Sequence, residues 1–312
     1  MSGVVAEISK YGKMNNVNIS PYIAEGTKER DFEDAVKIAG LKTAVYLAQA
    51  AAGHLADETE IFELDPYRAP QNLDLPRVAY YFQLYSPQHD HQGISDSCFY
   101  GTDVRNLCPT VIHPNEILDG GVVGHHTIRS LDTYTIQNHA VVKELYRRHG
   151  KELNFVGVVC GVAVMEPIRK QREAMLTSKL VAHILGAEGV ILTKIHGGMP
   201  HIDLATVAEE CEKLGVKTTL FVQPLVSRGT LSETALFNSE CLNAIIDPGA
   251  TQERILIPLD ADRILGGTEE THLFNPDPFI QKAGDKVIDT EEFLIAGVHD
   301  HLGGTKIIAT EY

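Results

Sequence analysis

The sequence lacks the features that mark several common classes of protein. No apolar run reaches the roughly 18 residues needed to span a bilayer, and the first residues, MSGVVAEISKYGK, lack the apolar core of a signal peptide. Basic residues are scarce, because 27 Lys and Arg against 42 Asp and Glu give a net charge of −15. Phosphate binding needs clustered Lys and Arg. We therefore expect neither nucleic acid nor a membrane as a partner.

Cysteine is also rare. The chain has five cysteines at irregular spacing, namely Cys98, Cys108, Cys160, Cys211 and Cys241. No CxxC pair occurs, which excludes a thiolate zinc knuckle, and the odd number argues against a disulfide framework. The expected location is the reducing cytoplasm. Cys241 precedes an apolar strand, so we expect it to be buried and inert. No GxGxxG, Walker A or GxSxG motif points to a nucleotide cofactor or an acyl-transfer triad.

From position 141 onward, apolar strands alternate with helices. The pattern predicts helices over 141–149, 167–185 and 204–214, strands over 154–159, 189–193 and 217–222, and apolar segments over 242–246 and 254–258. Asp203 is expected to cap helix 204–214. Such alternation is typical of an α/β fold with a mainly parallel sheet flanked by helices, built from Rossmann-like βαβ units.

The first 140 residues are less regular. They predict a helix over 31–52, a buried strand over 78–84, and short β-like pieces such as VNISPYIAE at 17–25. We expect three regions along the chain. They are an N-terminal α/β region that carries the site loop (1–140), a parallel βαβ region (141–267) and a C-terminal extension (268–312).

A predicted loop over residues 113–139 is dense in groups that can do chemistry. Glycines interrupt it, so the backbone can turn sharply and approach a ligand. A polar loop that leads into an α/β core is where a site is expected. The predicted substrate-binding residues are His113, Asn115, Gly120, Gly121 and Asn138, and the predicted catalytic residues are Glu116, Asp119, His125, His126 and Thr127.

Histidine is the main chemical signal. The chain has 14 histidines, and several lie in close pairs beside Gly or Asp, at 89/91, 125/126, 196/201 and 299/301. Imidazole backed by a carboxylate is how sites for zinc, iron or manganese are built. No pair has the i, i+4 spacing of an HExxH helix, and a solvated surface role is the ordinary alternative for any one pair. The predicted metal ligands are His125, His126, His139, His196 and His201, with Asp203 beside them.

Four segments resemble a known family. They are AVKIAGLKTAVYLAQA (35–50), HPNEILDGGVV (113–123), ELYRRHGKELNFVGV (144–158) and NAIIDPGATQERILIPLDADRILGG (243–267). Together they are similar to the proprotein of component B of glycine, sarcosine and betaine reductases, to which the D-proline reductase proprotein is related. The resemblance implies a subunit of a complex that reductively cleaves a C–N bond of a small amino acid or an N-methylated derivative. It also implies other subunits as partners, a homo-oligomer, or both.

The cofactor is the point at which the sequence departs from that family. There the precursor cleaves itself before a cysteine, which becomes a pyruvoyl group. The resemblance implies that this carbonyl condenses with the substrate's amino group while a selenol or thiol of a partner protein breaks the C–N bond. Here the matching stretch reads GHHT, with Thr127 in the place of the cysteine and His126 in that of the preceding asparagine.

A threonine hydroxyl could attack the preceding carbonyl and lead to a 2-oxobutanoyl group. The simpler prediction is that the chain does not process itself, and that its unknown cofactor is a divalent metal such as Zn, Fe or Mn. The family precursor also has an N-terminal segment ahead of the region matched here, which we expect a separate chain to supply or this member to lack.

Two other functions fit the same residues. One is a stand-alone metal-dependent lyase or hydrolase, in which Glu116 or Asp119 is the base toward a metal-bound water. It predicts stoichiometric metal and activity without partners. The other is a non-catalytic paralogue that stabilises a catalytic chain, although the added histidines argue against it. The fold alone does not decide among these functions.

Overall fold

The structure is a computed structural model of the 312-residue chain. It describes residues 6–7, 9, 11–19, 22, 24–64, 74–85, 104, 106–122, 131–164, 166–195, 198, 200–223, 237–242, 244–248, 254–258, 270–273, 279–282, 287–291, 301–303 and 308–309. None of the helices within these ranges is long and apolar enough to cross a membrane.

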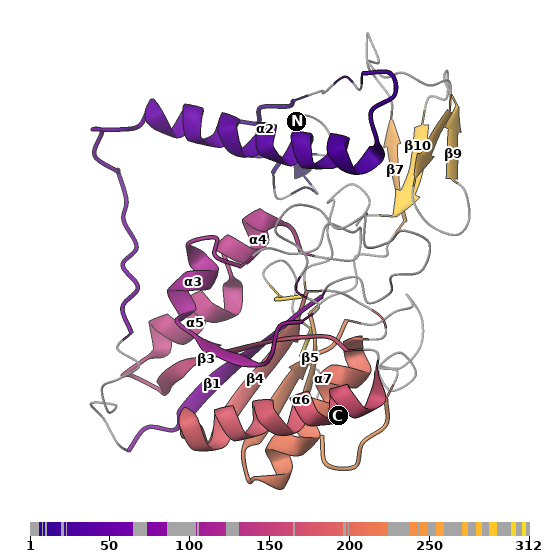
Figure 1. Ribbon diagram of the computed structural model, residues 1–312. Helices are drawn as coiled ribbons and strands as arrows, with labels where there is room; N and C mark the ends of the chain where they lie inside the picture. The colour runs from indigo at the N-terminus through magenta and orange to yellow at the C-terminus, as the bar shows by residue number, and fades with distance from the viewer. Residues whose placement is uncertain are drawn as a thin grey trace.

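A seven-stranded sheet forms the centre of the fold, with the strand order β11-β6-β5-β4-β1-β3-β2 (Figure 1). Its strands are β1 (Arg77–Leu84), β2 (Thr110–Ile112), β3 (Asn154–Val162), β4 (Gly189–Lys194), β5 (Lys217–Phe221), β6 (Ile245–Asp247) and β11 (Ile308–Ala309). The five inner strands are parallel, and the two edge strands, β2 and β11, pair antiparallel with their neighbours. The predicted α/β fold with a mainly parallel sheet is confirmed.

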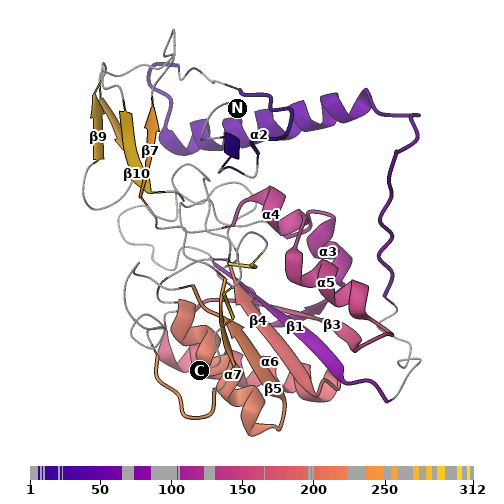
Figure 2. The ribbon, with the colours of Figure 1, turned by 180° about the vertical axis from the view of Figure 1, so that it is seen from behind.

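Helices cover both faces of this sheet (Figures 1 and 2). The helices α3 (Pro114–Leu118), α4 (Thr133–Gln137) and α5 (Ala140–Arg148) pack on one face, and α6 (Pro167–Lys179) and α7 (Pro200–Lys213) pack on the other. A short π-helix, η2 (Leu180–Ile184), continues α6. Each face therefore has its own apolar core, one under α3–α5 and one under α6 and α7.

Strand β1 lies between β3 and β4, so it has a neighbour on each side and a helix layer on each face. Its sequence, RVAYYFQL, is rich in aromatic and β-branched residues, which suit a strand buried on both faces. Side chains alternate along a strand. Ala79 and Tyr81 therefore enter the core under α6 and α7, whereas Tyr80 and Phe82 enter the core under α3–α5.

The helices begin and end where the sequence places capping residues. Glu166 caps α6 by accepting the N–H groups of Ile168 and Arg169, and Pro167 occupies the first turn. Helix α5 ends before Gly150, whose φ of +72° requires the left-handed region that favours glycine. The predicted helices 31–52, 141–149 and 167–185 and the strands 78–84, 154–159, 189–193 and 217–222 are confirmed within a few residues.

Other local predictions are wrong. VNISPYIAE contains no strand in the part that the structure describes. The predicted loop 113–139 contains two short helices, α3 and α4, because His113 and Asp132 cap them. Asp203 does not cap α7: the helix already begins at Pro200, and the carboxylate of Asp203 instead accepts the N–H of Val164.

The strands of the last third of the chain do not all join the parallel sheet. The predicted segment 254–258 is β7 (Arg254–Pro258), which pairs antiparallel with β10 (Val287–Glu291) in a separate sheet. Strands β8 (Glu270–Leu273) and β9 (Phe279–Lys282) form another pair. The central sheet draws strands from all three predicted regions, 1–140, 141–267 and 268–312. The boundaries of these regions stay a prediction.

Helix α2 (Glu29–Gln49) is the long helix predicted near the N-terminus, and it lies apart from the central sheet in both views (Figures 1 and 2). Ile38, Leu41 and Val45 lie on one side of it, because they are three and four positions apart. All three are exposed, Val45 to 61%. The apolar pattern that predicted this helix therefore does not correspond to burial against the sheet.

We expect Gly161→Ala to lower the free energy of unfolding by about 1–3 kcal/mol. A Cβ at this position of β3 would lie 2.7 Å from Tyr81 Oη and 3.1 Å from Tyr81 Cε2. Adding Tyr81→Phe removes the nearer atom, so it should recover part of the loss. Urea unfolding of the two single variants and the double variant measures this coupling.

The matched control is Gly40→Ala in α2, where a Cβ would meet nothing within 4 Å. It should raise the stability by up to about 1 kcal/mol, since alanine is the better helix former. Equal effects of the two alanine substitutions would contradict the packing of Tyr81 across β3.

Candidate functional site

The carboxyl ends of the central strands are where this topology places a ligand site. After β1 the chain passes to α3–α5 on one face, whereas after β3 and β4 it passes to α6 and α7 on the other. Neighbouring strands whose connections leave on opposite faces create a crevice at their carboxyl ends, and ligands bind in such crevices. The edge formed by the ends of β1, β3 and β4 is therefore the candidate site.

Lys194 is the last residue of β4 and is 0% exposed. Its Nζ lies 3.3 Å from Nδ1 of His301, which is also buried. None of the ion pairs in the described part of the chain involves Lys194. Burial lowers the pKa of the Lys194 ammonium to about 7. The amine can therefore gain or lose a proton near neutral pH, as reactive lysines do.

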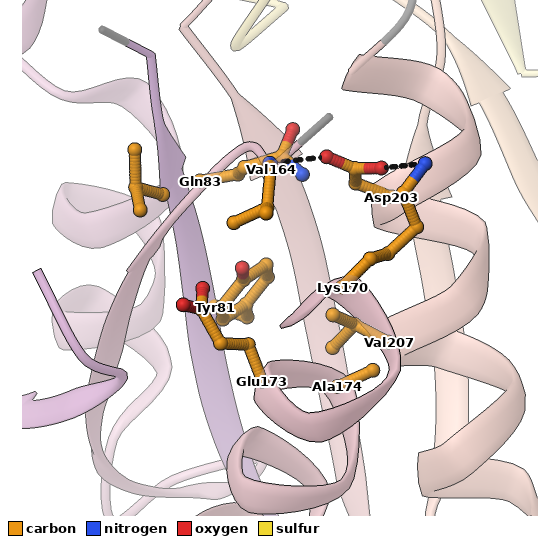
Figure 3. Close-up of a pocket in the computed structure, with 9 residues that line it drawn as sticks. Tyr81, Gln83, Val164, Lys170, Glu173, Ala174, Asp203 and Val207 are labelled. Carbon is orange, nitrogen blue, oxygen red and sulfur yellow. Dashed lines mark hydrogen bonds and ion pairs between the residues drawn. The ribbon is translucent and has the colours of Figure 1, made fainter. Parts of the chain in front are cut away.

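A small hollow lies beside this edge, between β1, β3 and the first turns of α6 and α7. Figure 3 shows Lys170 and Asp203 pointing toward each other across it, with the amide of Val164 on the other side of the carboxylate. Lys170 Nζ lies 2.5 Å from Asp203 Oδ1, and Val164 donates to Asp203 Oδ2 at 2.5 Å. The hollow has room for about one water molecule.

Two carboxyl groups of this hollow hold their protons more tightly than usual. Burial raises the pKa of Asp203, although the Lys170 ammonium and the Val164 amide oppose the shift. Burial also raises the pKa of Glu173, and the hydrogen bond from Arg169 opposes it. Burial raises the pKa of the Tyr81 hydroxyl well above its usual value, and both carboxylates add to that shift. Burial is therefore the main cause of all three shifts.

A second polar network lies deeper, on the other face of the sheet. Val142 donates its N–H to His139 Nδ1 at 3.4 Å, so the ring proton lies on Nε2 and is donated to Tyr80 Oη at 2.9 Å. Tyr80 in turn donates to the hydroxyl of Thr193. Burial lowers the pKa of His139 to about 3, so the ring is neutral at physiological pH. Both of its nitrogens are engaged, which leaves neither lone pair open to a metal in this arrangement.

The HPNE segment ties neighbouring parts of the chain together. His113 accepts the N–H of Asn115 and donates from Nε2 to the carbonyl of Leu64 at 2.8 Å. Asn115 donates to the carbonyl of Phe62 and accepts a hydrogen bond of 2.5 Å from the Tyr146 hydroxyl. Both side chains therefore hold residues 61–64 and α5 against α3. Their predicted substrate-binding role stays a prediction.

The remaining residues of this segment are more open. Glu116 and Asp119 are exposed, and Glu116 uses one oxygen to accept the N–H of His113 in a capping box. Asn138 is exposed and donates to the carbonyl of Tyr134. Gly121 is required for packing, because a Cβ there would lie 2.9 Å from the carbonyl oxygen of Glu116. At Gly120 the φ of +81° likewise favours glycine. Their assigned roles toward a ligand stay predictions.

Several predicted site residues lie outside the described part of the chain, namely His125, His126, Thr127 and His196. Of the predicted metal ligands, the structure describes His139 and His201, and His201 is fully buried in the first turn of α7. Within the described ranges, no three His, Cys, Asp or Glu side chains come together as a metal site. The complete histidine ligand set is therefore untested.

The sequence analysis did not identify the polar groups at the strand ends, and it predicted the wrong burial for one cysteine. Gln83, Lys170, Glu173 and Lys194 were not singled out, although a lysine that directly follows the apolar run GVILT was a signal. Cys241 is exposed, so the expectation that it is buried was wrong. Its strand, β6, begins only at Ile245, which leaves the cysteine in the segment before it. Cys160 and Cys211 are buried instead.

Comparison with known proteins identifies relatives of the whole chain. A family model for glycine/sarcosine/betaine reductase component B subunits matches residues 1–309. The component B subunits alpha and beta of the glycine reductase complex of Acetoanaerobium sticklandii are 31% identical over 272 residues, which is 85% of this chain and 62% of that protein. In Peptoclostridium acidaminophilum, the alpha subunit of sarcosine reductase component B is 32% identical over 240 residues, or 75% of this chain and 55% of that protein.

The component B alpha subunit of the betaine reductase complex of the same organism is 30% identical over 271 residues, or 83% of this chain and 60% of that protein. The chain thus spans about three fifths of the length of the curated relatives it matches. No solved structure matches it.

We expect the neutral state of His139 to make the fold sensitive to acid. The pKa is 6.5 in the ordinary state and about 3 in the folded chain, so the unfolded chain takes up a proton that the folded chain does not. Stability is therefore fully present above about pH 6.5 and falls by about 1.4 kcal/mol per pH unit below it. Urea unfolding from neutral pH downward measures the slope, which His139→Gln should reduce by about that amount.

The control is His54→Gln, because His54 is exposed in the loop after α2. It should keep the slope of the unaltered chain. A slope that His139→Gln leaves unchanged would mean that His139 can be protonated within the folded chain.

Proposed function

This chain belongs to the family of glycine/sarcosine/betaine reductase component B subunits, and from that premise we propose that it is a component B-like subunit of a reductase complex. The observation that carries the proposal is the family match over residues 1–309, because it includes every element of the central sheet. Crevice residues at the strand ends support a role with a small polar ligand.

The proposed reaction is the reductive cleavage of a C–N bond in a small amino acid or an N-methylated derivative. The carbon–nitrogen bond breaks, and its electron pair stays on the departing amine. A pair of thiols, or a selenol and a thiol, of another subunit supplies two electrons and a proton for the new carbon–hydrogen bond, and is oxidised to a disulfide or a selenenyl sulfide. The products are an amine and the corresponding carboxylic acid. In this scheme the present chain binds and orients the substrate.

A cysteine-derived pyruvoyl group does not fit the segment that we matched to the family's cleavage site. Thr127 stands there, and none of the five cysteines lies between positions 108 and 160. We therefore assign no step to such a group. A metal cofactor is an open proposal, and its ligands would come from His125, His126, His196 and His201. The engagement of both nitrogens of His139 argues against its part in the set.

Partner subunits are proposed for the same reason. The relatives are named as components of reductase complexes. Helix α2 offers Ile38, Leu41 and Val45 as an exposed apolar side, of the kind that subunit interfaces bury. We propose that another subunit of the complex covers this side. Free thiols at Cys108, Cys160, Cys211 and Cys241 agree with the proposed cytoplasmic location.

The function is tested by the release of amine. The full chain is combined with the other subunits of a glycine, sarcosine or betaine reductase complex that lacks its own component B, together with a dithiol reductant. We expect at least one of glycine, sarcosine and betaine to yield ammonia, methylamine or trimethylamine, respectively, with acetate as the other product, because the family match predicts the same C–N cleavage.

Omission of the dithiol is the control, and it should abolish the release. Absence of amine with all three substrates would contradict the proposed function. Substrate turnover by the chain alone, with stoichiometric metal, would favour the lyase or hydrolase instead.

The cofactor is tested by the intact mass of the purified chain under denaturing conditions. We expect a single unbroken chain of 34.2 kDa, because Thr127 replaces the cysteine at the matched position. A pair of fragments would contradict this expectation. Their masses would give the break position, whether before Thr127 or before one of the five cysteines, and a carbonyl reagent would then test for the new end group.

A further inference from the structure

Two hydrogen-bond donors are buried side by side at the edge where β1 and β4 end, and the described residues give them little or nothing to bind. Gln83 is 1% exposed and Lys194 is 0% exposed. Buried polar groups nearly always have partners, and lysine is almost never fully buried unless it is paired. The two residues are therefore exceptions that need an explanation.

Among the residues that the structure describes, neither Nε2 nor Oε1 of the Gln83 amide has a hydrogen-bond partner. The side chain lines the hollow in which Figure 3 shows Lys170 and Asp203. Leucine has nearly the same size and would avoid the cost of burying an unpaired amide. Glutamine at this position therefore lowers the stability of the fold, and no contact in the described chain compensates for that loss.

Lys194 has a similar deficit. Its one hydrogen-bond partner in the described chain is His301 Nδ1, at 3.3 Å. Burial lowers the pKa of its ammonium group. Asp203 on α7 is already paired with Lys170. Among the described residues, the ammonium therefore has no negative partner.

The register of the sheet brings the two donors together. Gln83 pairs with Lys194 across the parallel β1–β4 ladder, where strands lie about 4.8 Å apart. Tyr81 precedes Gln83 by two positions, and Leu192 precedes Lys194 by two, and both enter the core under α6 and α7. Because side chains alternate, Gln83 and Lys194 share that face. Both also stand at the carboxyl end of their strands.

We propose that Gln83 and Lys194 are the two donors of a carboxylate-binding subsite at the carboxyl edge of β1 and β4. A carboxylate can accept from the amide Nε2 and from the ammonium together, which satisfies both groups and supplies the missing charge. The hollow that Gln83 lines has room for about one water molecule, so it can take one oxygen atom of a carboxylate and not a whole acid. The subsite itself does not depend on the proposed function. The identity of its natural ligand does, because that ligand would be the carboxylate end of the amino-acid substrate.

Glu173 suits the other end of such a ligand. Glu173 lines the same hollow; its Oε1 accepts from Arg169 at 2.5 Å, and its Oε2 has no hydrogen-bond partner among the described residues. A carboxylate oxygen can accept a hydrogen bond from an ammonium group. Residues near the ends of β1 and β4 therefore offer both donors for a carboxylate and an acceptor for an amine.

The proposal is tested with acetate as the probe and the full chain as the protein. Calorimetric titration and thermal unfolding at neutral pH should give saturable binding and a rise in Tm, and chloride at equal ionic strength should give neither. Lys194→Met should weaken the binding of acetate by about tenfold or more, as expected for the loss of a charge-assisted hydrogen bond. The matched control is Lys217→Met, at the exposed start of β5, which should bind acetate unchanged.

Two variants of Gln83 keep the test decisive if Lys194→Met fails to fold. Gln83→Leu should raise the Tm of the free chain and weaken acetate binding. Gln83→Glu places a carboxylate beside Lys194 within the chain, so it should abolish the acetate effect. If Gln83 is instead held by a buried water only, Gln83→Leu lowers the Tm or leaves it unchanged, and acetate has no specific effect.

The subsite is overturned if acetate and chloride shift the Tm equally, or if both Gln83 variants bind acetate as the unaltered chain does. The amine-release assay distinguishes this failure from a failure of the proposed function. Amine release without acetate binding overturns the subsite alone, whereas specific acetate binding without amine release overturns the reaction alone.

Discussion

The burial of strand β1 on both faces is the constraint on which the rest of the structure depends. The strand pairs with β3 on one side and β4 on the other, and helices cover it from both directions. Every side chain from Ala79 to Leu84 is therefore withdrawn from water. A polar group in this strand must find its partners inside the protein or remain unsatisfied at a cost in stability. Both outcomes occur in this strand, three positions apart, at Tyr80 and Gln83.

Tyr80 shows the satisfied outcome. Its hydroxyl joins His139 at the start of α5 to Thr193 on β4, so one hydrogen-bonded chain links three elements of the fold. Burial keeps His139 neutral, and its Nδ1 caps α5 by accepting the N–H of Val142. Gln83 shows the unsatisfied outcome near the end of the same strand, beside Lys194, whose one hydrogen-bond partner in the described chain is His301. Unpaired polar groups that survive in an otherwise consistent interior tend to mark functional sites, and these two lie where α/β sheets bind ligands.

The side chains of the HPNE motif have a different role in the structure from the one that the composition of the motif suggests. HPNE is rich in groups that could bind a substrate, yet His113 and Asn115 use their side chains to hold residues 61–64 and Tyr146. In this chain the HPNE segment therefore builds part of the scaffold. The proposed substrate contacts move to the strand ends, which carry no recognisable motif. The family relation concerns the scaffold, so it does not depend on the prediction that Thr127 stands in the place of the cleavage cysteine, which concerns the chemistry.

The sequence by itself determined the α/β class, the central strands and most helices, because alternation between apolar strands and amphipathic helices is a local signal. It also determined the family, through segments such as HPNEILDGG and ELYRRHGKELNFVGV. It failed where the outcome depends on distant partners: Asp203 looked like a helix cap but pairs with Lys170, and Cys241 looked buried but is exposed. Only the tertiary structure placed Gln83 beside Lys194, since residues 111 positions apart become neighbours through the register of β1 and β4. Whether a buried polar group is paired is a property of that three-dimensional neighbourhood, and no local pattern in the chain encodes it.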